Sequence, residues 1–189
     1  MKAFAICGSP HVVGNTSKSL DYLLDKLEKE GIETDYIHIY EDHMIPCNCC
    51  NSCEIRADGR CVNEDDRMNE YLDRMRAADI IILCSPSYFG TCTGQMKIFL
   101  ERAGYCITTA GNEMKGKVGV AFATQDRDGG LTVYNELVDW LLRMEMTVLG
   151  CNPLPIITGS GPNDWEMDTK GIRALDRLSE RIVEFILGE

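Results

Sequence analysis

The sequence predicts an α/β fold in which a doubly wound, five-stranded parallel sheet carries helices on both faces. Strand-like and helix-like runs alternate along the whole chain of 189 residues. Residues 79–85 and 117–124 are almost continuously apolar, as parallel strands covered on both faces must be. There is no internal repeat and no linker-like segment, so we expect one domain over residues 1–189.

Apolar spacing predicts each element of the first half. The run Ala3–Cys7 is apolar and is followed by glycine, which indicates a buried strand. Residues 16–30 repeat leucine on one helical face and end at a glycine, which predicts a helix. Residues 34–40 alternate as a strand near the sheet edge does, and residues 65–78 repeat methionine and leucine at helical spacing.

The second half continues the alternation. Its strands are apolar runs of four to eight residues, and its helices place apolar side chains every three or four positions. The predicted elements are strands at 79–85, 117–124 and 147–150, the last continued by 156–157 after an interruption, and helices at 95–103, 131–144 and 170–187.

Charge and hydropathy exclude several classes of protein. The formal net charge is −11, from 19 basic and 30 acidic residues, so neither a nucleic acid nor an anionic membrane surface is an expected partner. No apolar stretch is long enough to span a bilayer, and the N-terminal apolar run is shorter than the core of a signal peptide. We expect a cytoplasmic protein.

The loop after the first strand has the composition of a phosphate site. Ligands of such sheets bind beyond the carboxyl ends of the strands, and this loop is rich in hydroxyl groups and opens a helix. It lacks the lysine of a P-loop and the glycine spacing of a dinucleotide site, which favours a monophosphate such as that of FMN. The alternative is that its polar residues only cap the helix. The candidate residues are Ser9, His11, Asn15, Thr16 and Ser17.

The loops after the third and fourth strands are candidates for a flat ring. The first offers two adjacent aromatic residues and a glycine, and the second offers a Gly-Gly pair that lets main chain approach a ring closely. The alternatives are ordinary packing for the aromatic pair and a solvated loop for the acidic residues. The candidate residues are Pro86, Ser87, Tyr88, Phe89, Gly90, Thr124, Asp126, Gly129 and Gly130.

Five of the ten cysteines lie between residues 47 and 61. Cys47, Cys50, Cys53 and Cys61 follow the spacing C-x2-C-x2-C-x7-C, whose compact triplet resembles the run that holds a [4Fe–4S] cluster in ferredoxins. Structural zinc more often takes two separated pairs. Cys49 could replace a ligand or pair with a neighbour on oxidation, and a loop without a cluster is the main alternative. Cysteines within apolar runs, such as those at 7 and 84, are expected core residues.

Together these segments resemble the flavodoxin-like NADPH-dependent FMN reductase family, and within it most closely the iron–sulfur flavoproteins. The resemblance covers nearly the whole chain and is carried by Gly8-Ser9-Pro10, Gly14-Asn15-Thr16-Ser17, Ile45-Pro46-Cys47 through Cys61-Val62, Asp65-Asp66, Met68, Ser85-Pro86, Tyr88-Phe89-Gly90, Gln95-Met96-Lys97 and Gly129-Gly130. It implies a flavodoxin-like fold and FMN at the three loops. It also implies a cluster in the cysteine-rich loop 45–64, and a homodimer or homotetramer with FMN near a subunit interface.

Two positions depart from the family pattern. His11 stands where a basic residue is usual, and Leu131-Thr132 replace the usual Gln-Glu after the two glycines. The first departure concerns phosphate binding, and the second concerns the contact over the ring and the nicotinamide site.

The expected function is electron transfer between a one-electron donor such as ferredoxin and an acceptor, through the cluster and FMN. No side chain is expected to act as a catalytic acid or base, because the flavin carries the chemistry. The first alternative is a clusterless FMN or quinone reductase that uses NAD(P)H as co-substrate. The second is a non-enzymatic redox or metal sensor.

Overall fold

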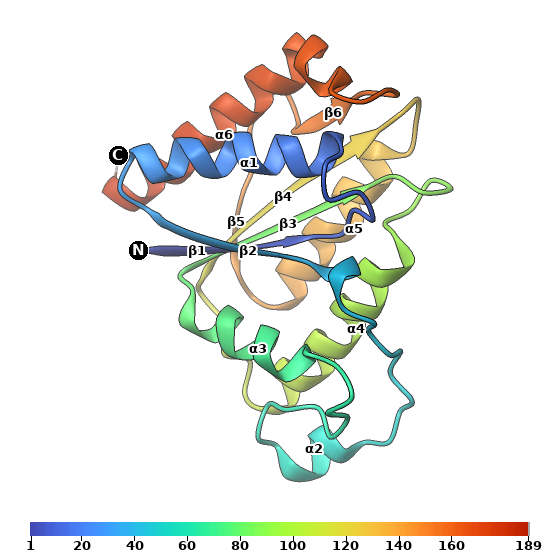
Figure 1. Cartoon of the computed structure of the whole chain (residues 1–189). Helices are drawn as coiled ribbons and strands as arrows, with labels where there is room; N and C mark the ends of the chain where they lie inside the picture. The colour runs from blue at the N-terminus through green and yellow to red at the C-terminus, as the bar shows by residue number, and fades with distance from the viewer. Residues whose placement is uncertain (189) are drawn as a thin grey trace.

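The computed structural model describes residues 1–188 and shows a parallel sheet between two layers of helices (Figure 1). The strand order is β2-β1-β3-β4-β5, and β6 also pairs with β4. This order is that of the flavodoxin-like class, so the predicted fold class is confirmed. The strands are β1 (Lys2–Cys7), β2 (Glu33–His38), β3 (Ile80–Pro86), β4 (Val118–Gln125), β5 (Thr147–Leu149) and β6 (Ile156–Thr158).

The predicted interruption of the last strand is also confirmed. Thr147 of β5 is in register with Val118, and Ile156 of β6 is in register with Ala123, further along the same strand. The two short strands therefore extend one edge of the sheet. The loop after β6 is thereby brought to the same sheet edge as the loop after β4.

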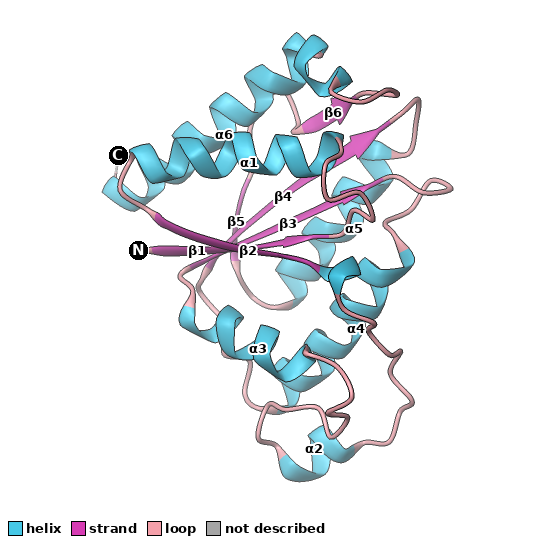
Figure 2. Ribbon diagram, in the orientation of Figure 1, coloured by secondary structure: helices cyan, strands magenta, loops and turns pink. Residues whose placement is uncertain are grey.

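Helices cover both faces of the sheet (Figure 2). One apolar cluster joins α1 (Asn15–Lys29) and α6 (Thr169–Leu187) to alternate residues of the strands, including the fully buried Cys7 and Cys84. The other cluster joins α3 (Met68–Ala77), α4 (Gly94–Thr109) and α5 (Gly130–Arg143) to the intervening residues, such as Phe4 and Ile6. The shorter elements are α2 (Ser52–Arg56), η1 (Ile39–Glu41) and η2 (Asp164–Met167).

Three element boundaries differ from the sequence prediction by more than one residue. The second strand ends at His38 and turns into η1, and His38, which pairs in register with Cys7, is only 5% exposed. Helix α3 begins three residues later than predicted, because the carboxylate of Asp66 accepts a hydrogen bond from Met68 N and so precedes the first turn.

Helix α4 does not end at residue 103 but continues to Thr109. Gly104 looks like a terminator in the sequence, but here it makes room for a neighbour. A Cβ at this position would lie 3.3 Å from Trp140 Nε1, which donates a hydrogen bond to Leu100 O at 2.8 Å. The part of the helix beyond residue 103, which the sequence prediction left out, includes residues that border the cysteine-rich segment.

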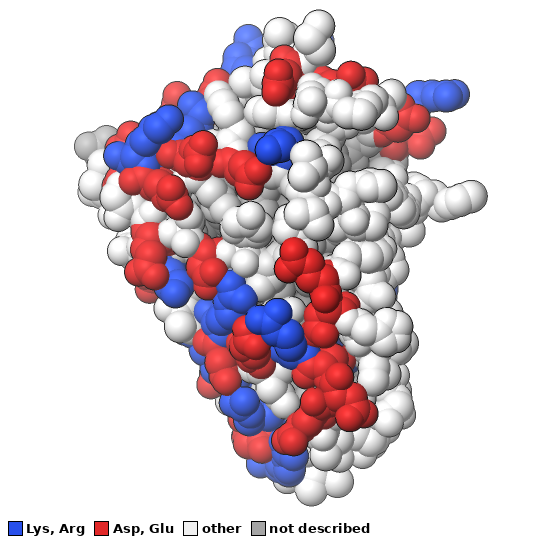
Figure 3. Space-filling model, viewed as in Figure 1, with Lys and Arg blue, Asp and Glu red and all other residues white. Residues whose placement is uncertain are grey.

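The surface carries charges of both signs. Figure 3 shows acidic and basic side chains interleaved over the lower part of the face in view, and mostly uncharged atoms along its right-hand edge. Among residues 1–188, no helix combines the length and the apolar character that a bilayer crossing requires.

Candidate flavin site and cysteine-rich segment

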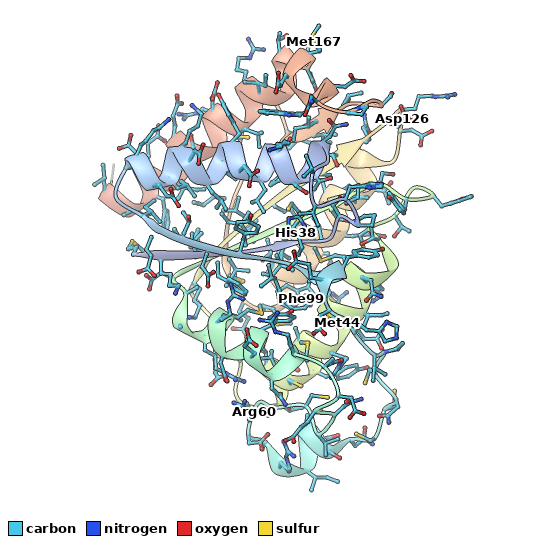
Figure 4. All side chains as sticks on the ribbon, in the orientation of Figure 1. His38, Met44, Arg60, Phe99, Asp126 and Met167 are labelled. Atoms are coloured by element: carbon cyan, nitrogen blue, oxygen red, sulfur yellow. The ribbon has the colours of Figure 1, made fainter. Side chains whose placement is uncertain are left out.

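The loops at the carboxyl edge of the sheet form one cavity of about 190 Å³, which we call the loop cavity. It is lined from the three predicted loops and from the loop after β6. Its lining residues are Ser9, His11, Gly14, Asn15, Thr16, Pro86, Ser87, Tyr88, Thr124, Gln125, Asp126, Gly159 and Ser160. Figure 4 labels Asp126 at the upper right rim of the molecule, beside these loops.

The start of α1 has the geometry of an anion site. The residue before the helix is Gly14, and no side chain caps its first N–H groups. Helical N–H groups without partners, together with the positive end of the helix dipole, attract phosphate. Thr16 Oγ1 lies 2.5 Å from Thr124 Oγ1, and both side chains are buried, so two hydroxyl groups meet at this end of the cavity.

The other polar residues of this loop shape it by binding main chain. Asn15 Nδ2 donates to the carbonyl oxygens of Gly159 and Gly161, each at 3.0 Å. Ser17 Oγ donates to His11 O at 2.7 Å and does not line the cavity. Ser9 Oγ accepts a hydrogen bond from His11 N at 3.1 Å. These side chains hold the loop open around the helix start rather than cap the helix.

The aromatic pair after β3 is split by a tight turn. Tyr88 and Thr91 exchange backbone hydrogen bonds of 2.9 and 3.2 Å, so Phe89 and Gly90 form a two-residue hairpin turn. Both have left-handed backbones, with φ of 52° and 80°, which is unusual for a bulky residue such as Phe89. Tyr88 lines the cavity, whereas Phe89 is fully exposed and does not.

The glycine pair after β4 serves the contact between two loops. Gly129 has φ 82°, and a Cβ there would lie 2.1 Å from Ser87 Oγ and 2.8 Å from Gly90 Cα. Gly130 N donates to Gln125 Oε1 at 2.8 Å. Neither glycine lines the cavity. Gly129 lets the loops after β3 and β4 touch, and Gly130 leaves room for the side chains of Gln125 and Ile156.

The sequence prediction missed the loop after β6. Gly159 and Ser160 line the cavity, and Ser160 Oγ is hydrogen-bonded to Asp126. The signal was present, because Gly159-Ser160-Gly161-Pro162 follows the apolar pair at 156–157 with one residue between them. Since β5 and β6 extend one edge in succession, only the second of them ends beside the other loops.

The cysteine-rich segment forms a second cavity of about 140 Å³, the cysteine cavity. All four predicted ligands line it, namely Cys47, Cys50, Cys53 and Cys61, and so does Cys49. Helix α4 supplies Arg102, Tyr105 and Cys106 to its wall. Figure 1 shows the segment at the bottom of the molecule around α2, away from the loops at the right.

The donor set of this cavity consists of thiols, which are the ligands that iron–sulfur clusters take. Among residues 1–188, no three His, Cys, Asp or Glu side chains are arranged as ligands of one metal ion. A [4Fe–4S] cluster takes one thiolate at each of its four irons, so the sulfurs surround it without meeting at a point. The left-handed backbones of Cys49 and Asn51, with φ of 54° and 57°, turn the loop tightly around the cavity.

One member of the set is held more firmly than the others. Cys61 N donates to Asn69 Oδ1 at 2.8 Å, and Asn69 Nδ2 donates back to Cys61 O at 2.9 Å. Arg102 Nη2 donates to Cys61 Sγ at 3.1 Å. In Figure 4, Arg60 marks the edge of this segment beside α3.

Arg102 forms a buried ion pair with Asp66, and the two side chains are 2% and 0% exposed. Burial by itself would raise the pKa of Asp66. The hydrogen bonds from Arg102 and from the N–H groups of Ile45 and Met68 outweigh it, so the pKa lies below its ordinary value. Arg102 Nη1 also donates to Ile45 O at 3.0 Å. The pair therefore joins the beginning of the segment to its last cysteine.

Cys106 contrasts with the four predicted ligands. Burial, with the nearby Cys61 and Cys53, raises the pKa of its thiol to about 12. At neutral pH Cys106 is therefore a neutral thiol in the cavity wall. Like Arg102, it lies on the second half of α4, near the helix end that the sequence prediction placed too early.

Comparison with known proteins agrees with this geometry. The model of the NADPH-dependent FMN reductase family matches residues 1–157. An iron–sulfur flavoprotein of Methanocaldococcus jannaschii is 34% identical over 193 residues, which cover 98% of this chain and 97% of that protein. An iron–sulfur flavoprotein of Methanosarcina thermophila is 31% identical over 98% of this chain and 95% of its own length.

A solved structure supports the fold independently. A flavodoxin from the domain Archaea superposes with a TM-score of 0.65 at 18% identity, covering 99% of both chains. At that identity the likeness concerns the fold alone, and the family follows from the sequence matches. The resemblance expected from the motifs is thus confirmed, and the chain belongs to the NADPH-dependent FMN reductase family.

Proposed function

We propose that this chain is an iron–sulfur flavoprotein that transfers electrons between a one-electron donor, such as ferredoxin, and an acceptor, through a [4Fe–4S] cluster and FMN. Membership of the family makes it an FMN-dependent oxidoreductase. The observation that carries the finer proposal is that all four spaced cysteines line one cavity while the loops at the sheet edge line another.

In the loop cavity, FMN would be held mainly by neutral groups. The free N–H groups at the start of α1 and the hydroxyl groups of Thr16 and Thr124 would bind the phosphate. Tyr88 and the main chain of residues 86–88 and 124–126, which line the cavity, would border the ring. When bound, the flavin supplies hydride and single-electron chemistry, and the chain supplies position and exclusion of water.

In the cysteine cavity, the ligands would be the thiolates of Cys47, Cys50, Cys53 and Cys61. Bound iron–sulfur clusters exchange single electrons. Asn69 and Arg102 already hold Cys61 in position, so this ligand would need little adjustment when a cluster binds. The other three lie on a loop with one five-residue helix, so we expect the loop to adjust around a cluster as it binds.

We further propose a homodimer or homotetramer in which FMN lies near a subunit interface, as the family resemblance implies. The exposed Tyr88–Phe89 turn beside the loop cavity supports it, because a fully exposed aromatic residue there is available to a second chain. We also propose a cytoplasmic location. All ten cysteines are unpaired, as is usual in a reducing compartment.

One absorption spectrum of anaerobically purified protein, with iron and acid-labile sulfide measured per chain after reconstitution, tests the proposal. We expect flavin bands together with broad iron–sulfur absorption, and about four irons per chain. Flavin bands with no iron uptake would reject the cluster.

The family match also favours a second candidate, an NAD(P)H-dependent FMN or quinone reductase without a cluster. The two differ in the reductant. A hydride donor delivers two electrons to the flavin in one step, whereas a one-electron donor such as reduced ferredoxin is expected to reduce the cluster first. Rapid mixing of the protein with NADPH, NADH or reduced ferredoxin separates them, since the clusterless reductase would show flavin reduction by a nucleotide and no change in iron–sulfur absorption with ferredoxin.

A further inference from the structure

We propose that Arg102 sets the reduction potential of the cluster, acting as a positioning residue through the sulfur of Cys61. The inference rests on the proposed cluster. It is carried by one contact, the hydrogen bond of 3.1 Å from Arg102 Nη2 to Cys61 Sγ, made by a side chain that is 2% exposed.

The guanidinium is locked in this orientation. Its Nη1 atom donates to Ile45 O at 3.0 Å and to the carboxylate of Asp66. The carboxylate of Asp66 in turn accepts hydrogen bonds from the N–H groups of Ile45 and Met68, at 3.0 and 3.2 Å. Because arginine presents its donors in a rigid planar fork, anchoring one nitrogen aims the other at the sulfur.

The contact distinguishes Cys61 from the other three cysteines. Within residues 1–188, Cys61 is the one member of the set whose sulfur accepts a hydrogen bond from a charged group. The sulfur of Cys47 accepts a hydrogen bond from Cys49 N at 3.5 Å, in an exposed part of the loop. One corner of the cluster would therefore face a buried positive donor.

The effect on the potential follows from electrostatics. Reduction adds one electron from the donor to the cluster and breaks no bond, and Arg102 keeps its protons throughout. Hydrogen bonds to the ligand sulfurs and positive charge nearby stabilise the reduced form and raise the potential. Asp66 opposes this, since its buried negative charge offsets that of the guanidinium.

Two substitutions are therefore expected to shift the potential in opposite directions. Arg102→Met removes the donor and the positive charge and leaves Asp66 buried, so the potential falls. Asp66→Asn removes the negative charge and keeps the side-chain shape, so Arg102 is no longer offset and the potential rises. A purely structural role for the pair would loosen the same segment in both variants and would not give opposite signs.

The experiment is a spectroelectrochemical titration of the reconstituted full-length protein, with the FMN couple of the same sample as internal reference. Arg76→Met is the matched control. Arg76 binds the segment through Gly59 O, but within residues 1–188 it donates no hydrogen bond to a cysteine sulfur, so the potential shift in Arg76→Met should be much smaller. Arg102→Lys, which keeps the charge without the fork, should lower the potential less than Arg102→Met does.

Opposite shifts in Arg102→Met and Asp66→Asn, with an unchanged FMN couple, support the inference. Shifts of the same sign, or none, overturn it while the proposed function stands. If Arg102→Met retains no iron, the potential shifts in the other two variants decide. A rise in Asp66→Asn together with a fall in Arg102→Lys supports the inference, and any other pair of shifts overturns it. A wild type that takes up no iron overturns the cluster, and this inference with it.

Discussion

The loop cavity and the cysteine cavity are built by opposite means. The first lies at the ends of parallel strands, and hydroxyl, amide and main-chain groups bind its loops to one another. The second lies in a segment with a single five-residue helix, joined at its base by one buried ion pair. The sheet positions the first site in advance, whereas the second depends on two charges and, we propose, on the cluster itself.

The largest expected difference concerns the cysteines. Cys50→Ala should abolish the cluster, because a [4Fe–4S] cube needs four thiolates, and should leave FMN bound, because the loop cavity shares no residue with the segment. Iron, sulfide and flavin per chain measure both effects.

Cys49→Ala is the matched control for this substitution, since Cys49 also lines the cysteine cavity but lies outside the compact spacing. It should keep the cluster. Loss of the cluster in Cys49→Ala and its retention in Cys50→Ala would show that the ligand set is wrong while the cofactor is right.

The next largest effect concerns the base of the segment. Asp66→Ala should lower the free energy of unfolding of the protein without cluster by about 3–5 kcal/mol, since it leaves Arg102 buried without its partner. Asp35→Ala removes a partner of Arg74 in a pair that is 24% and 32% exposed, and should cost less than about 1 kcal/mol. Urea unfolding followed by circular dichroism measures both. Equal losses of unfolding free energy in the two variants would contradict the expected difference between the buried and the more exposed ion pair.

The same pair predicts an acid dependence. Asp66 has a pKa below its ordinary value of 3.8 in the folded chain, so its contribution to stability is present above pH 3.8 and is lost as the pH falls through the lower, folded pKa. The difference in unfolding free energy between wild type and Asp66→Asn should therefore shrink in acid. A difference that stays constant from pH 6 to pH 3 and below would argue against the charge pairing.

In the loop cavity a single hydroxyl should matter less. Thr16→Ala should weaken FMN binding by about 1–3 kcal/mol, the range for a lost hydrogen bond to a charged group, and should leave riboflavin binding unchanged. Val13→Ala, in the same loop and 73% exposed, is the control without a polar group. Fluorescence quenching titrations with both flavins provide the measurement, and equal losses for FMN and riboflavin would place the phosphate elsewhere.

The smallest expected effect is at the hairpin tip. Phe89→Gly should stabilise the isolated chain by about 0.5–1 kcal/mol, because glycine adopts the left-handed backbone without the steric cost of a Cβ, although it is more flexible when unfolded. Tyr88→Gly, whose position has no left-handed backbone, should not stabilise it. Thermal unfolding of the two variants tests this, and a destabilised Phe89→Gly would show that the ring makes a stabilising contact.

The two regions also differ in how well the sequence predicts them. The loops after β1, β3 and β4 follow directly from buried apolar strands whose carboxyl ends share one edge, so their meeting was predictable. The polar residues of the loop after β1 were predictable only as a group. That Asn15 and Ser17 bind main chain, while Thr16 faces Thr124, depends on side-chain directions set by packing.

The cysteine spacing was plain in the sequence, but its supports were not. Arg102 and Asp66 are 36 residues apart and come together only when α3 and α4 pack side by side. The sequence prediction ended helix α4 at residue 103, because the approach of Trp140 to Gly104 is a tertiary contact that local patterns do not show. Local sequence patterns therefore identified the thiols but not the buried ion pair that supports their segment.

The sequence separation of Arg102 and Cys61 has a consequence for biosynthesis. Chains are made from the N-terminus, and Arg102 follows Cys61 by 41 residues. The four thiols leave the ribosome before the arginine, and before β3, the strand that carries α4 into place beside β1. The nascent segment therefore lacks Arg102 until the middle of the sheet has emerged, and the hydrogen bond from Arg102 to the sulfur of Cys61 can form only after that point.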